Sequence, residues 1–313
     1  MAKISIVVPV FNEAVTIMPF FTAINPVLSG LSDYEFEFVC VNDGSTDDTL
    51  NRLISVSKND PRIVVVDLSR NFGKEAALTA GLHEAQGDAI IPIDVDLQDP
   101  PELITHLIAE WRKGYEVVLA RRSDRSADSL MKRKSAAWFY KIHNMVSNTK
   151  IPEDVGDFRL LDRKVVEALK CLPESRRFMK GLFAWVGFRT TVIEYTRQPR
   201  VAGRSKFSAL KLWNFALEGI TSFSTLPLQI WIYIGLSVGI FAFAYMIFIV
   251  VRTLLFGIDI PGYASLLAAM LFLGGVQLIG IGVLGEYIGR TYMESKHRPL
   301  YLIRARYQSG VKQ

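Results

Sequence analysis

The sequence predicts an α/β fold: an open, mainly parallel sheet with flanking helices, followed by interfacial helices and two transmembrane helices. Up to about Trp111, short runs rich in Val and Ile alternate with helix-like segments, as in a parallel sheet that is buried on both faces. Two long stretches without a charged residue follow, at residues 228–251 and 264–285. Each is long enough to cross a bilayer, which takes about 20 residues.

The apolar runs give the expected strands, and the segments between them give the helices. Strands are expected at residues 4–10, 36–41, 63–68, 89–94 and 117–121. Residues 45–48 have the spacing of a capping box that opens a helix. Further helices are expected at residues 74–86, where Gly87 ends the helix, from the proline pair at 100–101 through Trp111, and at 130–148.

The composition limits the partners that the chain could have. Half of the 313 residues are apolar, and the mean hydropathy of +0.23 reflects an excess of apolar residues beyond Pro227. The net charge of +5 would suit nucleic acid, anionic lipid or a phosphorylated substrate. Cys40 and Cys171 have no metal-type spacing, so we expect two ordinary buried thiols in a reducing cytoplasm.

The charges around the uncharged stretches predict how the chain is divided. The linker 252–263 holds one Arg and one Asp, whereas the tail 290–313 carries six Lys or Arg and one Glu. Because Lys and Arg concentrate on the cytoplasmic side of membrane proteins, we expect the tail and the front of the chain there. Buried helices of a soluble protein are the alternative. The expected parts are an α/β domain at 1–205, an interfacial amphipathic helix at 206–226, a two-helix transmembrane hairpin at 227–289 and a basic cytoplasmic tail at 290–313.

Three carboxylates and an amide follow the fourth expected strand: Asp94, Asp96, Gln98 and Asp99. In open α/β sheets the ligand lies at the carboxyl ends of the strands. Carboxylates this close raise one another's pKa unless a cation neutralises them. Mg²⁺ or Mn²⁺ would do so, because such hard cations bridge carboxylates to a diphosphate. A solvated acidic turn, with Asp99 capping the next helix, is the alternative.

Two other strand ends also carry polar residues. Asp43, followed by Gly44, can accept hydrogen bonds from a base or a ribose, although Asn-Asp-Gly is also a plain turn. Arg70 and Lys74 bring two cations to a strand–helix junction, where the amino terminus of a helix favours phosphate. A surface loop with solvated cations is the alternative for this segment.

These motifs resemble the family-2 glycosyltransferases of the GT-A fold. More narrowly, the chain resembles the polyprenyl-phosphate glycosyltransferases, the group of dolichol-phosphate mannose synthase and the phage or prophage bactoprenol glucosyltransferases. The matching segments are residues 7–13 (VVPVFNE), 41–45 (VNDGS), 70–75 (RNFGKE), 94–100 (DVDLQDP), 156–160 (GDFRL), 203–207 (GRSKF) and 284–290 (LGEYIGR).

The resemblance implies a role for individual residues. It implies a nucleotide site made of Pro9, Phe11, Glu13, Asp43, Arg70 and Lys74. Asp94 would lie near the ribose or the donor sugar. It implies that Asp96 and Gln98 bind Mg²⁺ or Mn²⁺. It implies that the lipid phosphate is held by Arg122, Arg133, Ser135, Arg204 and Lys206. Asp157 is the carboxylate that we would test as a base or a sugar-orienting group, and an ion pair with Arg159 or a neighbouring cation is the alternative.

The resemblance also implies a reaction and its place. A family-2 enzyme would transfer a hexose with inversion, here glucose from UDP-glucose, to undecaprenyl phosphate. The product would be a lipid-linked sugar donor for O-antigen modification. The active site would face the cytoplasm at a bacterial inner membrane. A nucleic-acid site could use the basic and aromatic residues between Arg121 and Lys141, but the membrane spans argue against nucleic acid as a partner. Gly235 and Gly239 permit close helix packing, so a homo-oligomer stays open.

Two other classes of protein stay as alternatives. A processive polysaccharide synthase shares the same domain and membrane helices, but it usually carries a Q-x-x-R-W element, which this sequence lacks. A non-catalytic membrane anchor or a flippase component is the second alternative. A flippase would need polar residues inside the bilayer, and the two uncharged stretches have essentially none.

Overall fold

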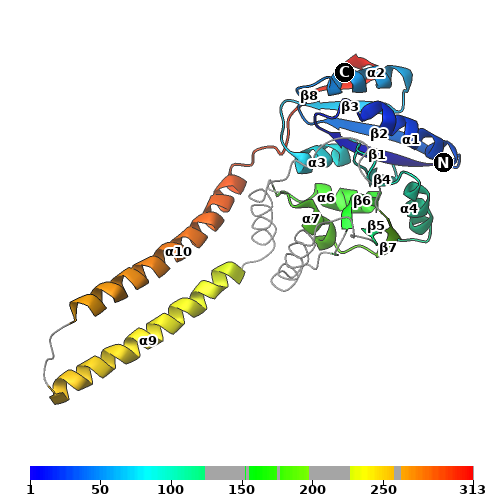
Figure 1. Cartoon of the computed structure of the whole chain (residues 1–313). Helices are drawn as coiled ribbons and strands as arrows, with labels where there is room; N and C mark the ends of the chain where they lie inside the picture. Colours follow the sequence, from blue (N-terminus) through cyan, green and yellow to red (C-terminus); the bar gives the residue numbers. More distant parts are fainter. Residues whose placement is uncertain (124–151, 153–154, 175–176, 197–225, 257–261, 313) are drawn as a thin grey trace.

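The computed structural model describes residues 1–123, 152, 155–174, 177–196, 226–256 and 262–312 (Figure 1). Arg133, Ser135, Arg204 and Lys206 lie outside these ranges, as do the helix expected at 130–148 and nearly all of the interfacial helix expected at 206–226. For these residues the predictions of the sequence analysis stand as predictions.

One nine-stranded sheet forms the α/β part, in the order β7-β5-β6-β4-β1-β2-β3-β8-β9. Strands β1 to β4 are parallel to one another, and β6 and β8 run antiparallel to their neighbours β4 and β3. The five expected strands are confirmed, the fourth shorter than expected because it ends at Pro92. The strands are β1 (Ala2–Val10), β2 (Tyr34–Asn42), β3 (Ile63–Leu68), β4 (Ala89–Pro92), β5 (Val117–Arg122), β6 (Val155–Asp162), β7 (Thr190–Tyr195), β8 (Ile303–Gln308) and β9 (Val311–Lys312).

Helices cover both faces of the sheet, which explains why its strands are apolar almost throughout. Alternate side chains of a strand enter opposite cores, so Phe38 and Cys40 of β2 pack on one face and Val39 and Val41 on the other. The first face is covered by α1 (Ile17–Ser29), α2 (Thr49–Asn59) and α4 (Leu103–Arg112), and the second by α3 (Lys74–Glu84), α6 (Arg163–Lys170) and α7 (Met179–Trp185).

Two helix ends differ from the expectation. The side chain of Ser45 does not cap α2; instead the carboxylate of Asp47 accepts the backbone N–H of Thr49 at 3.0 Å. Helix α3 ends at Glu84, before the predicted Gly87. Gly87 is required for a different reason: a Cβ there would lie 2.7 Å from the carbonyl oxygen of Lys3 on β1.

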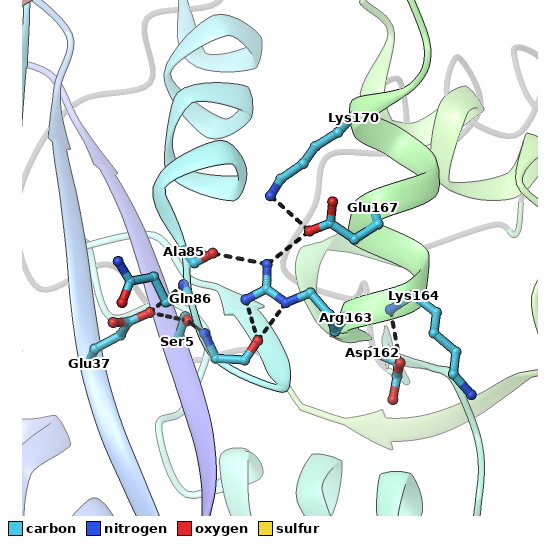
Figure 2. Close-up of polar contacts among 10 residues, drawn as sticks. Ser5, Glu37, Ala85, Gln86, Asp162, Arg163, Lys164, Glu167 and Lys170 are labelled. Atoms are coloured by element: carbon cyan, nitrogen blue, oxygen red, sulfur yellow. Dashed lines mark hydrogen bonds and ion pairs between the residues drawn. The ribbon is translucent and has the colours of Figure 1, made fainter.

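The guanidinium of Arg163 completes this end of α3 (Figure 2). Its Nη1 donates to the carbonyl of Ala85 at 3.0 Å, and its Nε donates to the carbonyl of Gly87 at 2.8 Å. The last carbonyls of a helix have no partner within it. A cation from the start of α6 therefore satisfies the turn that follows α3.

Two long apolar helices, α9 (Leu226–Phe256) and α10 (Tyr263–Ser295), extend side by side away from the α/β part (Figure 1). By length and composition, Leu228–Phe256 and Phe272–Ser295 could cross a membrane, with mean hydropathy of 2.5 and 1.4. No part of either apolar window is buried inside the structure. This exposure argues against the alternative of buried helices in a soluble core.

The basic tail is not a separate segment, contrary to the expectation. Its first residues complete α10, and β8 then pairs antiparallel with β3 in the sheet. The tail alternates Ile303, Ala305 and Tyr307 with more exposed polar residues, a period-2 pattern that fits a strand at the sheet edge. A second correction concerns the thiols: Cys40 is buried as expected, whereas Cys171 is exposed.

Candidate active site

The predicted polar rim lies at the carboxyl ends of β1 to β4. Because these four strands are parallel, the residues that follow them meet at one edge of the sheet. Asn12, Asp43, Arg70 and Asp94 each follow a different one of these strands. The structure thus brings together the segments that were expected to bind a nucleotide and a metal.

Gly44 lets two of these segments touch. Its φ of +64° lies in the left-handed region, and a Cβ there would lie 2.3 Å from the backbone carbon of Arg70. The close approach allows the carboxylate of Asp43 to accept the backbone N–H groups of Phe72 at 2.7 Å and Gly73 at 3.0 Å. Asp43 is only 2% exposed. Asp43 therefore organises the loop before α3.

This position changes the expectation for the amino terminus of α3. A phosphate was expected there, but Asp43 accepts two backbone N–H groups just ahead of the first turn. Burial raises the pKa of Asp43, and the two backbone donors and Arg70 oppose that rise. The Arg70 guanidinium lies over the Phe72 ring, 4.0 Å from its centroid. A contact of Asp43 with the nucleoside stays a prediction.

The loop after β1 is tied to the loop after β2. Asn12 adopts a φ of +53°, which is uncommon for a residue other than glycine and is often found at functional sites. Its backbone N–H donates to the hydroxyl of Ser45 at 3.0 Å, and its side-chain oxygen accepts the N–H of Thr46 at 2.8 Å. Pro9, Phe11 and Glu13 lie on this loop or just before it, and all three are partly exposed. They are therefore accessible to a ligand, as their predicted role requires.

Lys74 joins two carboxylates that are distant in the sequence. Its ammonium lies 2.8 Å from Asp94 and 2.7 Å from Asp157, with the Lys74 side chain 48% exposed. Burial opposes the charges of Lys74 and Asp157, but their mutual attraction outweighs it. The pKa of Lys74 is therefore raised, and the pKa of Asp157 is held well below its usual range by Lys74 and Lys180.

This geometry favours the ion-pair alternative for Asp157 over a general base. A carboxylate with a lowered pKa has little tendency to take a proton. The ion-pair partner is Lys74. Arg159 donates to the carbonyl of Gly156 at 2.6 Å, lies over the Phe183 ring at 4.1 Å from its centroid, and also helps to lower the pKa of Asp157. An orienting role for Asp157 stays a prediction.

Asp96 and Gln98 lie on one tight turn. Leu97 between them has a φ of +55°, and the backbone N–H of Gln98 donates to Asp96 at 3.2 Å. Gln98 is 9% exposed, and its side-chain oxygen finds no hydrogen-bond partner in the described part of the chain. A buried acceptor of this kind fits a cation.

A divalent metal is compatible with this small donor set. Within the described ranges, no three His, Cys, Asp or Glu side chains form a group that could hold a metal. Mg²⁺, however, usually takes one or two carboxylates from the protein and completes its shell with substrate phosphates and water. The Asp96–Gln98 turn fits a metal that binds together with a diphosphate.

Asp99 would cap the next helix in the alternative of a solvated acidic turn, but the amino-terminal cap of α4 is at Glu102. Asp99 instead accepts a short hydrogen bond from the hydroxyl of Tyr195 at the end of β7. Burial and then Asp99 raise the pKa of Tyr195 to about 12, against the effect of Arg122. Arg122, the one predicted lipid-phosphate residue in the described ranges, therefore lies near Tyr195. Nothing in the sequence around Tyr195 indicated this contact.

Comparisons with known proteins show the family to which the chain belongs. Residues 5–170 match the family described as Glycosyl transferase family 2, and residues 226–291 match the GtrB C-terminal hairpin. The chain is 58% identical over 302 residues to the bactoprenol glucosyl transferase of Shigella phage SfV, covering 96% of this chain and 98% of that protein. It is 57% identical over 302 residues to a prophage bactoprenol glucosyl transferase homolog of Escherichia coli (strain K12), with coverage of 96% and 98%.

A solved structure shares the fold. Glucosyl-3-phosphoglycerate synthase from Mycobacterium tuberculosis, in complex with Mn²⁺, UDP and glucosyl-3-phosphoglycerate, has a TM-score of 0.50 at 22% identity. The match covers 70% of this chain and 77% of that one. The chain is thus a glycosyltransferase of the GT-A fold, and it belongs to glycosyl transferase family 2.

Proposed function

We propose that this protein transfers glucose from UDP-glucose to a polyprenyl phosphate, undecaprenyl phosphate in a bacterial inner membrane. The observation that carries the proposal is the union, in one chain, of the acidic rim at Asp94 and Asp96 with the apolar hairpin of α9 and α10. A nucleotide-sugar site needs the first, and a lipid acceptor needs the second. Relatives named bactoprenol glucosyl transferase, similar over both parts, support it.

The proposed reaction is an inverting displacement at the anomeric carbon. An oxygen of the lipid phosphate forms the new bond, and the bond to UDP breaks. A phosphate is already anionic at neutral pH, so the nucleophile needs no general base. The lowered pKa of Asp157 agrees with this, because an ion-paired carboxylate orients groups better than it accepts protons.

The residues of the rim would bind and orient the donor. The loop of Pro9, Phe11 and Glu13 would contact the nucleoside, and Arg70 and Lys74 would face the diphosphate. Asp96 and Gln98 would hold Mg²⁺ or Mn²⁺, which when bound would neutralise charge on the leaving diphosphate. Asp94 and Asp157 hold the Lys74 ammonium at this rim, and in this fixed position the ammonium would face the donor.

The acceptor phosphate would lie on the side of the site that carries Arg122. Arginine suits this task because its planar fork holds two phosphate oxygens and stays charged. Arg133, Ser135, Arg204 and Lys206 complete the predicted set, and all four lie outside the described residues. Positioning of two bound reactants, with charge neutralisation, would then supply most of the rate.

The test is transfer of radiolabelled glucose from UDP-glucose into the organic phase, with undecaprenyl phosphate as acceptor. Asp96→Asn should lower the rate by about 10²–10³-fold or more while the protein stays folded, because a stabiliser of the leaving group is lost. Asp33→Asn is the matched control, because that carboxylate is 76% exposed and distant from the site. EDTA should inhibit the wild type, and Mg²⁺ or Mn²⁺ should restore it.

Each contrary result has a distinct meaning. Full activity in chelator would exclude the metal. Label in a polymer would favour a processive synthase, and no transfer to lipid with any nucleotide sugar would favour a non-catalytic anchor.

A further inference from the structure

The strand that returns from the second apolar helix contacts the donor site directly. In Figure 1, β8 follows α10 and lies beside β3, and only the short β9 lies outside it in the sheet. Ser69, the residue just before Arg70, has both its backbone polar groups held by this strand and the residue that precedes it. Its N–H donates to the carbonyl of Leu302 at 2.8 Å, and its carbonyl accepts a short hydrogen bond from Arg304. The segment that carries Arg70 and Lys74 is therefore fastened to the C-terminal strand.

Arg304 also faces a buried carboxylate on β3. Asp67 is 1% exposed, and its Oδ1 accepts the side-chain amide of Asn42 at 2.8 Å. Its Oδ2 has no hydrogen-bond partner within the described ranges, and the Nη1 of Arg304 lies 3.6 Å away. A buried carboxylate is costly unless a cation compensates it. Arg304 supplies that cation while half of its side chain stays exposed, at 56%.

From Asp67 a chain of polar contacts runs into the other donor-site loops. The side-chain oxygen of Asn42 accepts the backbone N–H of Ser45 at 3.3 Å. The hydroxyl of Ser45 in turn accepts the backbone N–H of Asn12 at 3.0 Å. Arg304 thus acts on two routes: through Ser69 on the segment before α3, and through Asp67 and Asn42 on the loops that follow β2 and β1.

We propose that Arg304 is a positioning residue that fixes the loops of the nucleotide site, so that the C-terminal strand is part of the donor-binding machinery. The first route reaches Ser69, the residue before Arg70, and the second holds Ser45, the residue after Gly44, so both act beside the close approach of Gly44 to Arg70. The nature of the ligand, a uridine nucleotide, rests on the proposed function. The positioning itself is a property of the free protein.

The same strand offers a matched control. Arg306 has the same charge, lies two residues further along β8 and forms a two-pronged ion pair with Glu84 of α3, at 2.9 and 2.7 Å. This pair also fastens the tail to the α/β part, but it lies near the carboxyl end of α3, away from the donor-site loops. If the tail merely docks on the α/β part, removing either arginine should disturb the donor-site loops equally. If Arg304 positions these loops, only the loss of Arg304 should disturb them.

The test compares Arg304→Ala, Arg304→Lys and Arg306→Ala in the full-length protein in detergent. Hydrogen exchange of the backbone amides in residues 42–46 and 69–73 is measured without ligand, and UDP is then titrated by calorimetry. For Arg304→Ala we expect exchange in both segments to rise by about 10-fold or more and the Kd for UDP to rise by about 5-fold or more. Arg306→Ala should change either by less than about 2-fold.

Arg304→Lys should lie between the wild type and Arg304→Ala, because an ammonium can face Asp67 but lacks the fork that also reaches Ser69. Unchanged exchange in both segments of Arg304→Ala, or an equal rise in Arg306→Ala, would overturn the inference. If Arg304→Ala does not fold, the Lys variant decides: wild-type exchange in both segments overturns the inference, and a rise supports it. A wild type that does not bind UDP would contradict the proposed donor, while the exchange experiment would still decide the role of Arg304.

Discussion

At the scale of single residues, the site places two cations, Lys74 and Lys180, near the carboxyl groups of Asp94, Asp157 and Glu75. Lys74 pairs with Asp94 and Asp157, and Glu75 lies next to it in the first turn of α3. Burial and then the charge of Asp157 raise the pKa of Glu75 from 4.5 to about 8, although Lys74 and Lys180 oppose the rise. Glu75 is therefore mostly protonated at neutral pH, which leaves the lysines to Asp94 and Asp157.

This protonation gives the stability a defined pH dependence. Between pH 4.5 and about 8 the folded protein binds a proton at Glu75 that the unfolded chain has lost. The contribution of protonated Glu75 to the free energy of unfolding is therefore fully present below pH 4.5 and is lost as the pH rises through 8. Glu75→Gln mimics the neutral acid and cannot titrate. We expect the melting temperature of the wild type to fall, relative to this variant, as the pH is raised from 5 to 9. A difference in melting temperature between the wild type and Glu75→Gln that stays constant with pH would contradict the raised pKa of Glu75. So would the same pH trend between the wild type and Glu35→Gln, which changes an exposed carboxyl group.

The position of the candidate site could be predicted from the sequence better than the contacts that its residues make. Asp94, Asp96 and Gln98 follow a buried strand, and a strand end is where an α/β sheet holds its ligand, so their place followed from pattern alone. The contacts of Asp43 depend on how closely Gly44 approaches Arg70. The pairing of Lys74 with Asp157 joins α3 to β6, and no local pattern encodes that distance.

At the scale of elements, the apolar pattern predicted strands and helices well and their ends poorly. An end is decided by capping groups, and these come from elsewhere in the chain. Arg163 at the start of α6 satisfies the turn after α3, which no feature of residues 74–86 could reveal. Strand β8 was missed because its arginines were interpreted as membrane-surface charge, although they alternate with Ile303, Ala305 and Tyr307.

The capping arginine leads to a prediction about stability. Arg163→Ala should lower the free energy of unfolding by about 1–3 kcal/mol, because it leaves partly buried carbonyls without a charged donor. Donor affinity should change little, since Arg163 follows β6 at the amino end of β4, at the edge opposite the site. Lys164→Ala is the control, because its side chain is exposed one position further on. Denaturant unfolding and UDP titration together check this; a loss of affinity at unchanged stability would contradict it.

At the scale of the whole molecule, β8 constrains how the chain can cross a membrane. The tail that leaves α10 pairs with β3, so it must lie on the same side as the α/β part that precedes α9. The hairpin of α9 and α10 must then cross twice or not at all. The composition of the tail, six Lys or Arg against one Glu, favours the cytoplasm for that shared side.

Cysteine labelling in intact cells tests this topology. The background is Cys171→Ser, because Cys171 is exposed, whereas Cys40 is buried and burial raises its pKa to about 12, so that it stays unreactive. One cysteine is placed at Asp259, between the two long helices and outside the described residues, and one at Ser309, in the turn between β8 and β9. An impermeant maleimide should label Asp259→Cys from outside and leave Ser309→Cys unlabelled until the cells are permeabilised. Labelling of Ser309→Cys in intact cells would contradict the cytoplasmic orientation. If Asp259→Cys is protected until permeabilisation, the hairpin does not cross the membrane, and the two helices lie on the cytoplasmic side.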